Sequence, residues 1–153
     1  MFAKEESIHV EATPEAVFDY VSDIRRHPQW ARHPLTMRET GDGKYESTAQ
    51  VMHLEPKTQI EIETVERPRR FTYLCDDNVA GKYRWHFDIA PVGSGSTIKY
   101  GLERLRAPLW VRLVQPWLLW PMDGRVGVLI GLANIKRAVE ATGTQPAAAP
   151  SAS

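Results

Sequence analysis

The sequence predicts an α+β domain in which one curved antiparallel sheet packs against a long C-terminal helix. Three observations predict this class. A strand and two short helical stretches open the chain, six strand-like segments joined by short turns follow, and a helical pattern of more than thirty residues ends it. The short turns favour antiparallel neighbours, because parallel strands need long crossover connections.

The N-terminal elements begin with a strand at Ser7–Ala12, where apolar and polar residues alternate. Thr13 and Pro14 then predict a helix start, since threonine caps helices well and proline fits the first helical position. The apolar stripe of this helix consists of Val17, Phe18 and Val21. A second short helix follows, and Pro28 cuts it near Trp30.

The middle of the chain contains six segments of strand character, each ending at a turn signal rich in glycine, proline or acidic residues. We expect strands at Leu35–Thr40, Lys44–Leu54, Lys57–Glu66, Arg70–Cys75, Val79–Ala90 and Ser96–Leu105. The first two are separated by Gly-Asp-Gly, which is typical of a hairpin.

The C-terminal helical pattern is interrupted in its first half by two prolines and a glycine, and it is cleanest over Val126–Ala141. One continuous apolar face is formed by Val128, Leu132, Ile135 and Val139. Gly127 and Gly131 lie one turn apart and indicate either close packing of this helix on the sheet or room left for a ligand.

The chain length of 153 residues fits one domain, which we expect to span residues 1–140. Residues 141–153 have no charge, no large apolar side chain and two prolines, so we expect them to form a disordered tail. Cys75 is the single cysteine, which excludes an internal disulfide, and no signal-peptide pattern opens the chain. These features favour a cytoplasmic location.

The 19 basic and 19 acidic side chains cancel, so charge gives no support for nucleic-acid binding. The distribution is uneven, however. Residues 77–153 carry nine basic and five acidic side chains, and between Arg104 and Arg137 the only acidic residue is Asp123.

One face of the predicted sheet is rich in aromatic residues. In the strand from Tyr83, alternate residues are aromatic or aliphatic, whereas His86 and its neighbours in phase are polar and point outward. A single helix cannot cover so wide a face, which leaves either a packed aromatic core or a cavity for a small molecule. The candidate lining residues are Trp30, Tyr45, His53, Phe71, Tyr73, Tyr83, Trp85, Phe87 and Tyr100.

Several segments resemble the START-related superfamily called SRPBCC, particularly its polyketide cyclase/dehydrase-like branch. The N-terminal match is ESIHVEATPEAVFDYVSDIRRHPQW, and later matches are Glu66-Arg67-Pro68, YRWHFDIAPVGSGSTIKY and GLANIKRAVE. Together they cover nearly all of residues 5–140 in the expected order. The resemblance implies a helix-grip fold, in which a seven-stranded antiparallel sheet wraps the C-terminal helix around a hydrophobic cavity. Its members include lipid carriers and polyketide cyclases, so the fold does not select a function.

Motifs for other chemistry are missing from the sequence. The five histidines form no HExxH or other close cluster, so we expect no metal site, and no catalytic triad or phosphate-binding glycine loop is recognisable. His27 and His33 flank Trp30 and are expected on surface loops by default, whereas His53 is in phase with inward residues of its strand. We expect no organic cofactor.

Residues 107–122 depart from the pattern of the family, because they contain Trp110, Trp117 and Trp120 among leucines. The stretch is too short to span a bilayer, which takes roughly 20 apolar residues. It is interpreted as a buried segment before the helix, a lid over the cavity, or an interfacial anchor on anionic lipid. A dimer interface is a further alternative.

The leading hypothesis is therefore a protein that binds a lipid-like or aromatic polyketide-like molecule in an internal cavity, as a monomer or homodimer. The first alternative is an enzyme of the cyclase or dehydratase type that uses the same cavity. The second is a membrane-peripheral or interaction module that acts through the tryptophan-rich segment.

Overall fold

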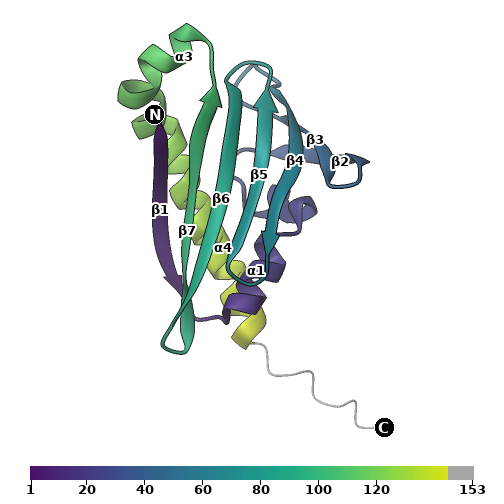
Figure 1. Cartoon of the computed structure of the whole chain (residues 1–153), viewed down its shortest axis with the longest axis vertical. Coiled ribbons are helices and arrows are strands. Elements are labelled where there is room, and N and C mark those ends of the chain that lie inside the picture. The colour runs from purple at the N-terminus through teal and green to yellow at the C-terminus, as the bar shows by residue number, and fades with distance from the viewer. Residues whose placement is uncertain (145–153) are drawn as a thin grey trace.

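A computed structural model describes residues 1–144 of the chain. Within this range seven strands form one antiparallel sheet in the order β1-β7-β6-β5-β4-β3-β2, and the sheet curves around the long helix α4 (Figure 1). The strands are β1 (Ala3–Val10), β2 (Leu35–Gly41), β3 (Lys44–Ala49), β4 (Lys57–Glu66), β5 (Arg70–Asp77), β6 (Gly81–Val92) and β7 (Gly95–Arg106). The predicted α+β helix-grip architecture is confirmed.

The helical elements occupy the two positions that the sequence predicts, between the first two strands and after the last. They are α1 (Pro14–Val21), η1 (Ile24–Arg26), α2 (His27–Trp30), α3 (Leu109–Val114), the π-helical η2 (Gln115–Gly124) and α4 (Arg125–Thr144). The side chain of Thr13 accepts a hydrogen bond from the backbone N–H of Ala16 (3.2 Å), which confirms it as the N-cap of α1.

The core lies between the inner face of the sheet and the helices α1 and α4. The predicted apolar face of α4 is entirely buried: Val128, Leu132, Ile135 and Val139. The sheet contributes its inward aromatic and aliphatic residues, among which Phe71 and Phe87 have no exposed surface. The alternation in β5, β6 and β7 therefore places the aromatic side chains against the helix, as expected from strand periodicity.

Several predicted boundaries are wrong. The first strand, for example, is Ala3–Val10 rather than Ser7–Ala12. The strand expected to run to Leu54 ends at Ala49, because residues 50–54 fold back into a turn in which Val51 and Leu54 pair with each other. At the other end, α4 continues to Thr144, so the first residues of the expected tail are helical. The remainder of that predicted tail, residues 145–153, lies outside the described residues.

The segment that joins β7 to α4 is a helical cap at one end of the molecule (Figure 1). We use "cap" for α3 and η2 together, which are residues Leu109–Gly124. Two prolines, Pro116 and Pro121, occur in η2, where a regular α-helix would lose hydrogen bonds. None of the helices within residues 1–144 combines the length and apolar character needed to cross a bilayer.

Candidate functional site

A cavity of about 520 Å³ lies at the capped end of the molecule. Its walls are the inner face of the sheet from β2 to β7, helix α2 with the loop after it, the cap, and the first turn of α4. This volume is within the range of roughly 300–1,000 Å³ that is typical of small-molecule sites. The helix grip therefore contains a partly open cavity as well as a packed core.

The cavity wall from the sheet consists mainly of aromatic side chains on β6 and β7. Tyr83 and Trp85 are two residues apart on β6, and Tyr100 and Leu102 are two apart on β7, so all four side chains point to the same face. The ring of Trp85 stacks on Tyr100, with ring centroids 5.1 Å apart. Stacked rings lose little freedom when a ligand binds, so this wall is a rigid apolar surface.

The helix α2 contributes a second group of stacked rings. His27 stacks on Trp30 with centroids 4.2 Å apart, and the ring of Trp30 meets Tyr100 edge to face at 5.6 Å. Helix α2 is fixed on α4 by Asn134, whose Nδ2 donates to the backbone oxygen of Trp30 (3.1 Å). Both His27 and Trp30 are cavity-lining residues, and the rings of the two walls form one continuous assembly.

Two polar atoms in this assembly have no hydrogen-bond partner. Among the described buried side-chain atoms, only Nδ1 of His27 and Nε1 of Trp30 are unpartnered. Burial lowers the pKa of His27 to about 4, because the charged imidazolium would lose its hydration. His27 is therefore neutral at pH 7.

Tyr100 of this wall is paired with Tyr73, a core residue that does not line the cavity. The hydroxyl oxygens of Tyr73 and Tyr100 are 3.2 Å apart and form a buried hydrogen bond. The pKa of both hydroxyls is raised, mainly by burial, so both hydroxyls remain protonated at neutral pH. Only one hydroxyl donates within the pair, so the pair offers hydrogen bonding but no charge.

The cap is attached to the sheet by a chain of hydrogen bonds. Arg104 on β7 donates to Oε1 of Gln115 (2.8 Å), and Nε2 of Gln115 donates to the hydroxyl of Tyr83 (3.2 Å). Tyr83 in turn donates to the backbone oxygen of Ala80 (3.1 Å). Gln115 is buried, so this network satisfies a polar side chain that would otherwise cost stability.

At the rim of the cavity, the C-terminal end of the cap is attached to the loop after α2 by an ion pair. Nη1 of Arg32 donates to Oδ1 of Asp123 (2.8 Å) and to its backbone oxygen (3.2 Å). Nε2 of His33 lies 3.4 Å from the same carboxylate oxygen. We call Arg32 and Asp123 the clasp, since they join the loop after α2 to the end of η2 across the rim of the cavity.

The nine predicted lining residues, and the three tryptophans of residues 107–122 that were predicted as a lid or an interface, fall into three groups. At the cavity surface lie Trp30, Tyr83, Trp85, Tyr100, Trp110 and Trp120. Buried in the adjoining core are Phe71, Tyr73 and Phe87. Elsewhere lie Tyr45, which packs against the core from β3, Trp117, which is exposed on the cap, and His53.

The inward orientation expected of His53 is wrong. The alternation that would place it inward stops at Ala49, and His53 is an exposed residue of the following turn. The opposite error concerns His27, which was expected on a surface loop but is part of the cavity wall. Its spacing from Ile24 and Trp30, three residues on either side, is the helical signal that marks the buried face.

The two glycines of α4 have different roles. A Cβ on Gly131 would lie 3.3 Å from the ring of Trp30, so this glycine permits close packing of α2 on α4. A Cβ on Gly127 would come no closer than 3.9 Å to its nearest neighbour, the side chain of Arg32, and Gly127 lines the cavity. Gly131 therefore allows close approach of α2 rather than of the sheet, and Gly127 leaves open space at the cavity.

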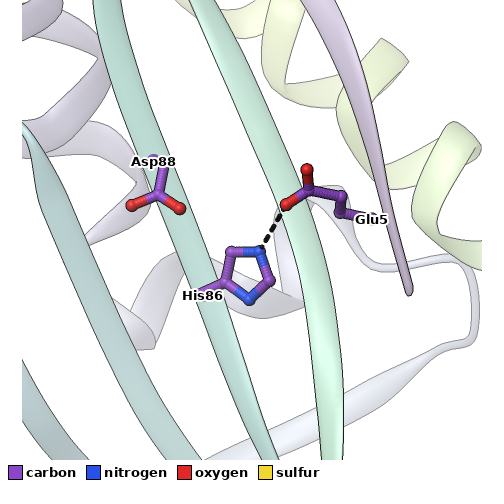
Figure 2. A group of neighbouring side chains, drawn as sticks. All are labelled: Glu5, His86 and Asp88. Carbon is purple, nitrogen blue, oxygen red and sulfur yellow. Dashed lines mark hydrogen bonds and ion pairs between the residues drawn. The ribbon is translucent and has the colours of Figure 1, made fainter. Parts of the chain in front are cut away.

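A group of potential metal ligands occurs on the outer face of the sheet, away from the cavity. Figure 2 shows Glu5, His86 and Asp88, with Nε2 of His86 3.1 Å from the Glu5 carboxylate. The carboxylates already have cationic partners: Arg70 donates to Asp88 (2.7 Å), and Lys99 lies 3.9 Å from Glu5. These ion pairs explain why the three side chains lie together on the charged outer surface.

Comparison of the sequence with protein families gives one match over residues 1–140, to the model described as "Polyketide cyclase / dehydrase and lipid transport". No curated protein sequence matches the chain.

The fold is shared with many solved structures. Protein CV1439 from Chromobacterium violaceum superposes with a TM-score of 0.73 at 15% identity, covering 92% of this chain and 99% of that one. TTHA0849 from Thermus thermophilus gives 0.72 at 17% identity, over 94% and 100%. The di-domain ARO/CYC protein StfQ from the steffimycin biosynthetic pathway gives 0.72 at 11% identity, covering 92% of this chain but 52% of StfQ. At these identities the similarity shows the fold alone.

Proposed function

Since this chain belongs to the family described as polyketide cyclase/dehydrase and lipid transport, we propose that it binds a lipid-like or aromatic polyketide-like small molecule in its cavity. The observation that carries the proposal is the cavity of about 520 Å³ with its stacked aromatic wall. Such a wall favours an apolar ligand, because each Å² of apolar surface removed from water contributes about 25 cal/mol.

The polar groups at the cavity favour binding over proton transfer. His27 is neutral at pH 7, and the raised pKa of Tyr83 and Tyr100 keeps their hydroxyls protonated. At the rim, Arg32 and Asp123 neutralise each other. The Asp77 carboxylate at the cavity accepts hydrogen bonds from Thr58 and from the backbone N–H groups of Val79 and Ala80. The other polar groups of the interior are mainly neutral, and they can orient a mostly apolar molecule without a large desolvation cost.

The first experiment is native mass spectrometry of the gently purified full-length chain, followed by solvent extraction and identification of any released compound. A stoichiometric lipid or aromatic compound is the expected result. Affinity is then measured in vesicle-free buffer with the uncharged fluorescent probe N-phenyl-1-naphthylamine, for the wild type and for Trp85→Ala. Removing the stacked indole is expected to weaken probe binding at least about tenfold.

Trp117→Ala is the matched control for Trp85→Ala. Both changes remove one tryptophan, but Trp117 is exposed on the cap and lies outside the cavity wall. The control is expected to bind the probe like the wild type. Equal weakening by the two changes, or no probe binding by the wild type, would contradict a ligand site in the cavity.

A second candidate is a cyclase or dehydratase that uses the same cavity. The observation that favours it is His27, whose unpartnered Nδ1 belongs to a cavity-lining ring and can accept a proton. The pKa of about 4 makes this group a weak base at neutral pH. The test is turnover of a poly-β-keto thioester by the wild type and its loss in His27→Phe with probe binding retained.

A further inference from the structure

The cap carries six exposed large apolar side chains, of which all but Trp110 lie outside the cavity lining. We call this group the outer patch, and it consists of Leu109 (67% exposed), Trp110 (52%), Leu113 (64%), Trp117 (84%), Leu118 (50%) and Met122 (67%). A tryptophan with this degree of exposure is unusual in a protein that meets only water. Contiguous apolar surfaces of this kind mark sites of interaction with a partner or a membrane.

The cap is apolar on its inner side as well. Val111, Leu119 and Trp120 line the cavity, and only Trp110 belongs to both surfaces. A helical segment that is apolar all round is stable only when both sides are covered. The sheet and α4 cover the inner side, which leaves the outer patch without a cover in the described part of the chain.

The charges around the outer patch indicate which kind of partner would bind there. Residues 107–122 contain no acidic side chain, and Arg112 lies exposed among the apolar residues with no ion pair in the described structure. The acidic residue that follows, Asp123, already forms an ion pair with Arg32. Tryptophan together with arginine is the combination that favours the boundary between lipid headgroups and acyl chains, especially where the headgroups are anionic.

A second copy of the chain fits this surface less well. A two-fold contact through the outer patch would bring together two patches that each carry Arg112 and offer no free carboxylate to pair with it. A bilayer supplies both requirements, an apolar layer for the side chains and phosphates for the guanidinium group.

The position of the cap allows contact with a flat surface. Figure 1 shows α3 at one end of the molecule, beyond the end of β7, while the hairpin between β6 and β7 lies at the other end. The segment is also too short to span a bilayer, so it would lie within the interface.

We propose that the outer patch docks the protein on anionic phospholipid membranes. Trp117, Leu113 and their neighbours enter the headgroup region, and Arg112 pairs with lipid phosphates. Because the inner side of the same cap is a wall of the cavity, docking places the cavity next to the bilayer. If the function proposed above holds, the ligand is then a molecule that partitions into membranes.

The test is flotation of the full-length protein with vesicles of phosphatidylcholine containing phosphatidylserine, compared with vesicles of phosphatidylcholine alone. Binding is expected to be stronger to the anionic vesicles and to weaken as salt is added, since salt screens the attraction. Trp117→Ala is expected to lower the partition coefficient at least about tenfold, and Arg112→Gln to lower it about fivefold on anionic vesicles only.

Val65→Ala is the matched control, because Val65 is an exposed apolar residue on β4, outside the cap. It is expected to partition like the wild type. The proposal is overturned if the wild type does not float, if Trp117→Ala floats equally well, or if Trp117→Ala instead dissociates a homodimer in analytical ultracentrifugation. Probe binding by Trp117→Ala without vesicles separates a failure of docking from a failure of the cavity site.

Discussion

Arg32 and Asp123, which are 91 residues apart in the chain, form the ion pair that closes the rim of the cavity. Both oxygen atoms that Arg32 contacts belong to Asp123, near the end of η2, so the pair joins the loop after α2 to the cap. Partly exposed pairs of this kind contribute only about 0–1 kcal/mol to stability. Their effect on the movement of the cap is therefore expected to exceed their effect on unfolding.

Breaking the clasp is expected to speed ligand exchange. In Asp123→Ala the cap loses its charged contact with the loop after α2, and the probe is expected to dissociate up to about fivefold faster, in line with the energy of such a pair. Stopped-flow displacement of N-phenyl-1-naphthylamine measures the rate. Asp19→Ala, which breaks the exposed pair with Arg67 far from the cavity wall, is the control. Equal dissociation rates in both variants would show that the clasp does not restrain the cap.

Two substitutions at Gly127 distinguish an effect on helix stability from an effect on cavity volume. Gly127→Ala is expected to stabilise the protein by about 0.5–1 kcal/mol, because alanine is the better helix former and its Cβ meets no close neighbour. Gly127→Leu is expected to weaken probe binding at least about tenfold by entering the cavity. Urea unfolding and probe titration measure the two effects.

Gly131→Ala is the comparison for these changes. Its new Cβ would press on the ring of Trp30 at 3.3 Å, so it is expected to stabilise less than Gly127→Ala or to destabilise. Unchanged probe affinity in Gly127→Leu would mean that the ligand does not occupy the space beside the first turn of α4.

Stability is expected to fall between about pH 6.5 and 4 because of His27. In this window the imidazole binds a proton in the unfolded chain, where its pKa is near 6.5, but not in the folded chain, where the pKa is about 4. The unfolded state therefore gains stability as the pH falls, and the loss amounts to about 3 kcal/mol once the pH is below both values. Urea unfolding at pH 7, 6 and 5 measures the slope before most carboxylates titrate.

The slope is expected to disappear in His27→Gln, which cannot titrate. His53→Gln is the matched control, since His53 is an exposed residue of a turn, and it should keep the slope of the wild type. A slope that persists in His27→Gln would assign the acid sensitivity to another group.

The buried tyrosine pair is expected to behave as a unit. Tyr73→Phe leaves the hydroxyl of Tyr100 without its partner, and Tyr100→Phe does the same to Tyr73, so each change should cost about 1–2 kcal/mol. The double variant should cost less than the sum of the two, because no unpaired hydroxyl remains. Unfolding free energies of the four proteins give the coupling, and Tyr45→Phe on β3 serves as the control. Strict additivity would show that the hydrogen bond contributes nothing.

The sequence predicted the elements of the fold better than the composition of the site. Strand alternation and turn signals located β4 at Lys57–Glu66, because both effects are local. The same alternation could not separate Trp85, at the cavity surface, from Phe87, in the core, since both point to one face and depth depends on what α4 covers. No sequence pattern predicted the clasp, because Arg32 and Asp123 come together only in the tertiary fold.

The three tryptophans in the sequence of the cap did not reveal which of them would be buried and which exposed. Trp120 is buried, Trp110 lies at the boundary and Trp117 is exposed, although all three belong to one short apolar segment. The π-helical η2 sets the directions of Trp117 and Trp120, and its wider spacing departs from the period of 3.6 residues that sequence patterns assume.

The two ends of the described chain differ in what can be attached to them. Phe2 is buried, with its ring 6.2 Å from that of Trp120 and beneath the guanidinium group of Arg104, so a tag fused to the N-terminus emerges beside the cap. Helix α4 ends at Thr144, and the C-terminal end of this helix lies on the side of the molecule opposite α3 (Figure 1). A fluorophore or surface anchor is therefore better joined after α4, where it leaves the outer patch and the cavity rim free for measurement.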